Sequence, residues 1–167
     1  MKWMVVGVAA LLLVGCDTTS TAPFGLNWGQ SMDSISFIKA GKCQKNGNKT
    51  VCTFGQQKPF NDWSYENQLT FDDGGALIQV ATTLVGVEDY TSPKPDFADF
   101  QQKLENEMSY LTKQGLSQQV ASEFLSKCQS ETSCNKVSES SLTHVGMSNL
   151  WVTINPTPIA IVTYHQD

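Results

Sequence analysis

The sequence contains no arginine, so all 11 of its basic residues are lysines. Its 16 acidic residues outnumber them, and the formal net charge at pH 7 is −5. Because guanidinium groups bind phosphates and base edges with two parallel hydrogen bonds, an acidic chain that lacks them is not expected to bind nucleic acid. The sequence also offers no polybasic patch for anionic lipid. A chain of 167 residues that is 40% hydrophobic and 10% aromatic is expected to fold, as one domain rather than two.

The sequence also lacks the motifs of common catalytic sites. It contains no G-x-S-x-G, H-E-x-x-H, P-loop or dinucleotide-binding pattern, and its thiols lack the C-x-x-C spacing of redox enzymes. No local signature pairs His144 or His165 with a nucleophile. Glu105 and Glu107 are two residues apart on a predicted helix, so they do not face each other and are expected to be solvated. We therefore predict no enzymatic activity, no catalytic residue and no cofactor.

The first residues have the order of features found in an export signal. Lys2 precedes an uninterrupted, mostly apolar run over Met4–Val14. As a helix this run would span about 16 Å, roughly half of a bilayer core, so it predicts a signal peptide rather than a membrane span. Leu13-Val14-Gly15-Cys16 then resembles the lipobox of bacterial lipoproteins. That resemblance implies cleavage before Cys16, acylation of Cys16 and a membrane-anchored mature chain, and the alternative is ordinary secretion with a free cysteine.

This resemblance sets the expected domain organisation. Residues 1–15 form the signal peptide, residues 16–23 form an acylated cysteine with a polar tether, and residues 24–167 form one domain that faces the periplasm. Asp17 follows the lipobox cysteine and resembles the signal that retains enterobacterial lipoproteins in the inner membrane. The expected location is therefore the bacterial cell envelope, and Asp17 favours the inner membrane.

Four cysteines remain after Cys16, and an even number in an exported domain predicts two disulfides. Gly47-Asn48 suits a two-residue type II′ hairpin turn, which places Cys43 opposite Cys52 as a non-hydrogen-bonded pair. The register thus predicts Cys43–Cys52 and, by elimination, Cys128–Cys134. A zinc site is the competing interpretation, but these spacings differ from those of zinc ribbons, and we predict no metal site. Asp72 and Asp73 are explained by a hairpin turn rather than by calcium binding.

Hydrophobic periodicity predicts an α+β fold, with an antiparallel sheet of five or six strands in a hairpin meander and about three helices, mainly on one face. The expected elements, in addition to the cysteine hairpin, are a helix over 32–40 capped by Ser31, strands over 63–71 and 76–85, a helix opened by Asp96 and ended by Gly115, a helix capped by Ser117, and closing strands over 150–154 and 159–164.

A turn at Asp73-Gly74 would pair the two central strands so that Leu69 lies opposite Ile78 and Trp63 lies opposite Leu84. The apolar faces of the two strands then coincide. In this register the loops 55–62 and 86–95 emerge at the same end of the hairpin.

Aromatic side chains beside charged ones are typical of interface anchors, and these two loops carry Phe60 and Tyr90. We therefore name Phe60 and Tyr90 as candidate partner-binding residues. The alternative is that both rings fold back over the sheet and complete the core.

The function expected from these observations is that of a non-enzymatic binding or accessory subunit in the cell envelope, attached to the membrane through its lipid anchor. An immunity protein that neutralises a toxin delivered to the periplasm is the alternative, and an enzyme is the third possibility. The partner is accordingly an envelope protein or a toxin.

Overall fold

The computed structural model describes residues 21–91, 94–134, 138–139, 147–153 and 156–165. The elements in these residues are the strands β1 (Lys42–Asn46), β2 (Lys49–Phe54), β3 (Glu66–Phe71), β4 (Leu77–Val85), β5 (Ser138–Glu139), β6 (Met147–Thr153) and β7 (Ile159–His165), and the helices α1 (Phe97–Lys113), α2 (Gln118–Lys127) and α3 (Glu131–Cys134).

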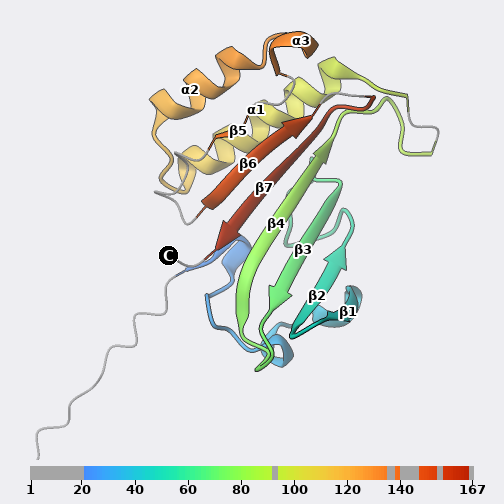
Figure 1. The fold of residues 1–167 in the computed structure, drawn as a ribbon, viewed down its shortest axis with the longest axis vertical. Coiled ribbons are helices and arrows are strands. Elements are labelled where there is room, and N and C mark those ends of the chain that lie inside the picture. Colours follow the sequence, from blue (N-terminus) through green and yellow to red (C-terminus); the bar gives the residue numbers. More distant parts are fainter. Residues whose placement is uncertain (1–20, 92–93, 135–137, 140–146, 154–155, 166–167) are drawn as a thin grey trace, which may run out of the picture.

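The described strands form one antiparallel sheet in the order β1-β2-β3-β4-β7-β6-β5. The first four strands are a meander of hairpins, and the three helices lie in the chain between β4 and β5. Figure 1 shows α1 and α2 side by side over one face of the sheet. The predicted α+β class is therefore confirmed, while the two-residue strand β5 lies where the sequence predicted no strand.

The core lies between this face of the sheet and the helices. Along β7 the side chains alternate between buried and half-buried, as expected for a sheet covered on one side. Helix α1 contributes the apolar stripe that its spacing predicted, and its four innermost apolar residues are at most 1% exposed: Phe100, Leu104, Met108 and Leu111. Sequence periodicity therefore identified the buried face of this helix.

The ends of the two long helices agree with the sequence signals. The Asp96 side chain accepts a hydrogen bond from the Asp99 N–H at 3.0 Å and so caps α1. Gly115 follows α1 with a φ of +110°, a backbone conformation that glycine adopts with little strain. Ser117 caps α2 through the Gln119 N–H at 3.3 Å.

Both predicted disulfides are present. Gly47 has a φ of +62° at the β1–β2 turn, and Cys43 pairs with Cys52 in the register that this turn imposes. The second disulfide joins Cys128 to Cys134. Because disulfides persist in oxidising surroundings, the pair indicates a compartment outside the cytoplasm.

The register of the central hairpin differs from the prediction by two residues. Leu69 lies opposite Val80 rather than Ile78, and a bulge at Thr70/Phe71 follows. The turn is wider than a two-residue loop because the Asp72 carboxylate accepts the Ala76 N–H at 2.8 Å. A shift of two keeps side chains on their original faces, so the apolar faces still coincide although the paired residues were wrong.

The helix predicted over 32–40 does not form. Two short 3₁₀ helices, Met32–Ser34 and Ile38–Ala40, stand in its place, and the Ser31 side chain makes no capping hydrogen bond. The reason is tertiary, because the Met32 N–H donates to the Gly75 carbonyl at 2.9 Å and the backbone is held beside the start of β4. Between the two 3₁₀ helices, Ile35 is extended and buried.

The folded domain includes residues that the sequence assigned to the tether. Ala22 is 8% exposed, Pro23 is buried, and Thr21 forms a bridge with Asn27. Cys16 and Asp17 lie outside the described residues. No helix in the described part of the chain is long and apolar enough to cross a bilayer.

Candidate functional site

The two loops that the sequence places at one end of the central hairpin do meet there. Gln56, from the loop after β2, donates from Nε2 to the Tyr90 hydroxyl at 3.5 Å and to the Asp62 carbonyl at 3.4 Å. The predicted convergence is therefore confirmed, although the register from which it was argued was shifted by two residues. The loops still meet because a two-residue shift of the register does not change which end of the hairpin each strand reaches.

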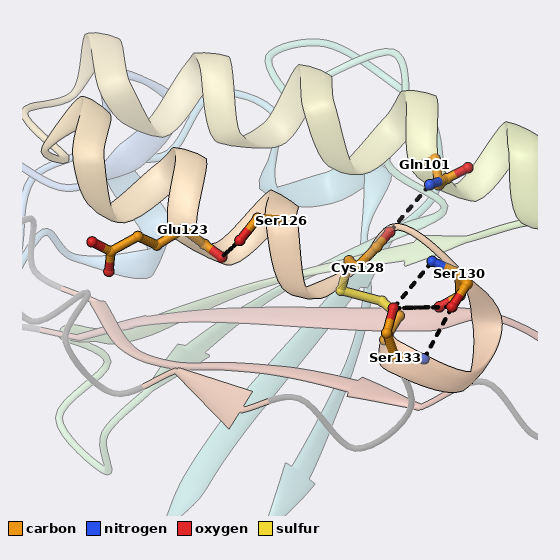
Figure 2. The surroundings of a disulfide bond; sticks show 7 residues. Gln101, Glu123, Ser126, Cys128, Ser130 and Ser133 are labelled. Atoms are coloured by element: carbon orange, nitrogen blue, oxygen red, sulfur yellow. Dashed lines mark hydrogen bonds between the residues drawn. A yellow bond between two sulfur atoms is a disulfide. The ribbon is translucent and has the colours of Figure 1, made fainter.

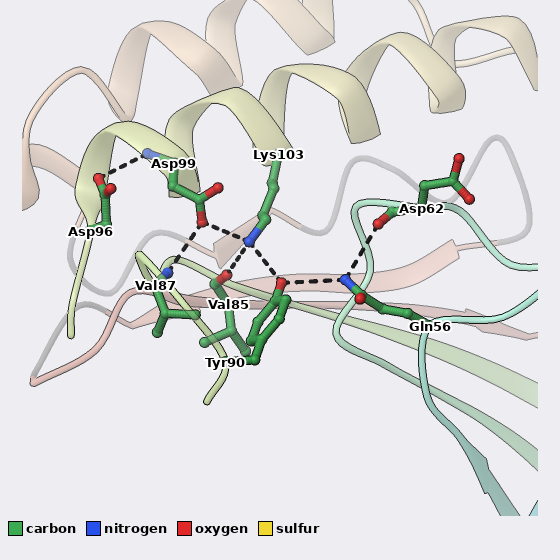
Figure 3. A network of polar contacts seen from close by, with 8 residues as sticks. All are labelled: Gln56, Asp62, Val85, Val87, Tyr90, Asp96, Asp99 and Lys103. Atoms are coloured by element: carbon green, nitrogen blue, oxygen red, sulfur yellow. Dashed lines mark hydrogen bonds and ion pairs between the residues drawn. The ribbon is translucent and has the colours of Figure 1, made fainter. Parts of the chain in front are cut away.

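A lysine of helix α1 connects the loop 86–95 to the helix through hydrogen bonds (Figure 3). Lys103 donates from Nζ to the Asp99 carboxylate at 2.6 Å, to the Tyr90 hydroxyl at 2.8 Å and to the Val85 carbonyl at 2.9 Å. These bonds use all three protons of the ammonium group. The Asp99 carboxylate also accepts the Val87 N–H at 3.1 Å. The start of the loop is thus held by the first turns of α1.

The surroundings of Lys103 favour its charged form. Partial burial lowers the pKa of Lys103, but the hydrogen bonds to Asp99 and Tyr90 act in the opposite direction and outweigh it, so the pKa lies above its ordinary value. Gly86 permits the close approach of loop and helix, because a Cβ at this position would overlap the Asp96 carbonyl and the Phe100 side chain. The spacing of Asp99 and Lys103 is the one sequence signal that could have revealed this cluster.

Tyr90 presents its ring at the surface next to a second tyrosine. Tyr65 is 46% exposed and Tyr90 is 39% exposed, and their ring centroids are 5.3 Å apart. They are the exposed large hydrophobic side chains of the described residues. The Lys103 ammonium lies 4.9 Å from the centroid of the Tyr90 ring, a cation–π distance. The pair is therefore an aromatic surface with a fixed geometry, which we call the Tyr65–Tyr90 surface.

Phe60, the other predicted anchor, is not at the surface. It is 1% exposed, and its ring contacts Phe24, Phe37 and Phe54 with centroid separations of 5.1, 5.5 and 5.2 Å. The alternative interpretation, that the ring completes the core, describes Phe60. A ring covered in this way offers no surface to a partner, so the aromatic surface at this end comprises Tyr65 and Tyr90.

Glu107 contradicts the expectation that it is solvated, because it is fully buried beneath α1. Its carboxylate accepts hydrogen bonds from Trp63 Nε1 at 2.7 Å, from the Tyr164 hydroxyl at 3.1 Å and from Asn61 Nδ2 at 3.4 Å. The sequence did hold a signal, since Glu107 falls between Leu104 and Leu111 on the apolar stripe of the helix.

Burial raises the pKa of Glu107 above its ordinary value, although the three hydrogen bonds act in the opposite direction. Burial likewise raises the pKa of Tyr164 well above its ordinary value, and the neighbouring Glu107 contributes to that shift. The donors around this carboxyl come from the loop before β3 and from β7, so the group joins helix to sheet. The Glu107 carboxyl group thus connects α1 to the sheet through hydrogen bonds within the core.

The second disulfide joins Cys128, which follows the last residue of α2, to Cys134, the last residue of α3 (Figure 2). Gln101 of α1 donates to the Cys128 carbonyl at 3.1 Å, which links the end of α2 to the longest helix. Ser130 and Ser133 satisfy each other's backbone and hydroxyl groups at the start of α3, with distances from 3.1 to 3.2 Å. Both cysteines are buried.

Within the described residues, His165 and the acidic side chains form no cluster with known chemistry. His165 lies on β7, and His144 lies outside the described residues. In the part of the chain that the structure describes, no three residues of the types His, Cys, Asp and Glu gather as a metal site. Asp72 closes its turn, and Asp73 forms an exposed ion pair with Lys45 at 3.4 Å.

Comparison with known proteins gives no relative to guide the assignment. No protein-family model, no curated protein and no solved structure matches this chain. The function must therefore be argued from the residues themselves.

Proposed function

We propose that the protein is a lipoprotein of the bacterial cell envelope, anchored through acylated Cys16, which acts as a non-enzymatic binding or accessory subunit and contacts its partner through the Tyr65–Tyr90 surface. The observation that carries this proposal is the order of Lys2, the apolar run and Leu13-Val14-Gly15-Cys16 in front of a domain with two disulfides, which are typical of an oxidising compartment.

The anchor would hold the domain close to the bilayer. Six peptide units separate Cys16 from the buried Ala22, and an extended chain of that length reaches about 22 Å at most. Several acyl chains on one cysteine give stable attachment, since each buried methylene contributes about 0.8 kcal/mol. A partner of this domain is therefore a protein at or near the membrane surface, and Asp17 favours the inner membrane.

The Tyr65–Tyr90 surface has the properties of an interface anchor. Tyrosine supplies a large contact area at a low cost in side-chain entropy, and aromatic anchors dominate many interfaces. Here the ring of Tyr90 is already held by Lys103 and Gln56, so little conformational freedom remains to be lost on binding. The nearby ammonium group of Lys103 and carboxylate of Asp99 already hydrogen-bond to each other and to the loop. This supports binding rather than catalysis as the role of this end of the molecule.

The anchor is tested by metabolic labelling with a palmitate analogue. We expect the wild-type chain to be labelled and to sediment with membranes, and the Cys16→Ser chain to lose the label and its signal-peptide processing, because the thiol is the acylated atom. Thr19→Ser serves as the matched control and is expected to behave like the wild type. A Cys16→Ser chain that is still labelled and processed normally would show that Cys16 is not the anchor.

The partner surface is tested by capturing a tagged full-length chain from its native envelope. We expect a stoichiometric partner with the wild type and its loss with Tyr65→Ala and Tyr90→Ala combined, because truncating such anchors costs about 2 kcal/mol or more. Tyr65→Phe keeps both rings and leaves the hydrogen bonds to the Tyr90 hydroxyl in place, so it is expected to retain the partner.

Retention of the partner by the double alanine variant, with unchanged folding, would contradict the surface assignment. If the captured partner is an enzyme whose activity is abolished at one-to-one stoichiometry, the protein is an immunity protein rather than an assembly subunit.

A further inference from the structure

A second feature of the domain is a groove beside its first described residues. The groove has a volume of about 500 Å³ and lies where residues 21–27, the loop around Pro59 and the last turns of α1 meet. That volume falls within the range of about 300–1,000 Å³ that is typical of small-molecule sites. The groove is separate from the Tyr65–Tyr90 surface, and one of its lining residues, Asn61, also hydrogen-bonds the buried Glu107.

Two aromatic rings build one wall of this groove. Phe24 stacks on Tyr110 with ring centroids 5.7 Å apart and an angle of 7° between the planes. Phe24 has a φ of +63°, a left-handed conformation that is uncommon for a bulky residue, and it is the one non-glycine residue of the described chain with a positive φ. Strained backbone persists where the surroundings hold it, and it is often found where a ligand is clamped.

Three carboxamides are among the polar side chains that line the groove, beside the hydroxyl groups of Thr21 and Tyr110. Asn61 donates from Nδ2 to the buried Glu107 carboxylate at 3.4 Å, which fixes the orientation of its amide and leaves Oδ1 as an acceptor. Asn27 is half-buried and Gln114 is exposed, and within the described part of the chain neither side-chain amide forms a hydrogen bond, so both are open to a ligand. Each carboxamide presents a donor and an acceptor side by side, so the group can bind two neighbouring hydroxyls of one ligand.

The described lining of the groove has no charged side chain, and this restricts the chemistry of its ligand further. An ionic ligand would be partly desolvated there without a counter-ion. A neutral molecule rich in hydroxyl groups avoids that cost. Its hydroxyls fit the carboxamides, and its C–H faces fit the aromatic wall. We propose that this groove binds a neutral saccharide.

The proposal is tested by titration calorimetry on the full chain, kept in a zwitterionic detergent that has no sugar headgroup. The probes are chitotetraose and maltotetraose. We expect saturable binding of at least one of them, and affinity about tenfold weaker for Asn27→Ala and for Gln114→Ala, since the loss of a hydrogen bond to a ligand is commonly near 1.4 kcal/mol. Gln102→Ala, on the same helix but outside the groove, is the control with unchanged affinity.

Three results would overturn the proposal: no saturable binding of either tetrasaccharide to the wild type, unchanged affinity in both groove variants, or equal binding of the anionic tetragalacturonate. Each is independent of the anchor at Cys16 and of the Tyr65–Tyr90 surface, so failure here is distinguishable from failure of the proposed function.

Discussion

Replacing Phe60 with alanine is expected to lower the free energy of unfolding by about 3–5 kcal/mol. The ring is 1% exposed and contacts three other phenylalanine rings, from residues 24, 37 and 54. Removing it forfeits the transfer free energy of a buried aromatic side chain and leaves a cavity that rigid neighbouring rings fill poorly. Chemical denaturation followed by circular dichroism measures the loss.

The matched comparison is Tyr90→Ala, which truncates an aromatic side chain of the neighbouring loop. Tyr90 is 39% exposed, so this variant is expected to lose only about 1 kcal/mol, as ordinary substitutions do. A larger loss for Tyr90→Ala than for Phe60→Ala would show that the two rings have been assigned to the wrong environments. The pair of variants thus separates a residue that stabilises the core from one that is available to a partner.

Glu107 carries the second large expected effect, because its carboxyl is buried among three donors. In Glu107→Leu the Trp63 N–H and the Tyr164 O–H lose their acceptor, and the orphaned buried hydroxyl of Tyr164 alone costs about 1–3 kcal/mol. Glu107→Gln keeps an acceptor oxygen and resembles the protonated carboxyl, so its loss is expected to be smaller. Thermal unfolding of the variants at one pH tests this order, and a Gln variant less stable than the Leu variant would contradict it.

The same group gives a pH dependence with a defined sign. The pKa of Glu107 is raised in the folded protein, so the folded state binds more protons than the unfolded state between the ordinary glutamate pKa and the raised one. Its stabilising contribution is therefore complete below the ordinary pKa and decreases as the pH rises through the raised pKa. We expect the melting temperature of Glu107→Gln, relative to the wild type, to rise over this interval.

Glu105→Gln is the control for this experiment, because Glu105 is exposed on the same helix two residues away. Its melting temperature relative to the wild type is expected to be nearly independent of pH over the same interval. A Glu107→Gln difference that is flat or falls with rising pH would show that the carboxyl is not buried as described.

Several features of this protein are determined by short stretches of its sequence. Asp96 and Gly115 bound α1, and Gly47 sets the register that brings Cys43 to Cys52. These features depend on caps, turns and glycine conformations that act over a few residues, so the sequence predicted them correctly. The inward face of α1 was predicted for the same reason, since the spacing of its apolar residues marks one side of a helix.

Only the tertiary structure decided what lies opposite each of these elements. The first residue of the segment 32–40 pairs through its backbone with the turn before β4 and no regular helix forms there, and the Asp72 side chain widened the central turn and shifted the register by two residues. Glu107 is buried because Trp63 and Tyr164, 44 and 57 residues away in sequence, supply its donors. Periodicity states which side of an element is apolar, but the partner across the core is chosen by packing and hydrogen bonding between distant segments, and no local pattern encodes that choice.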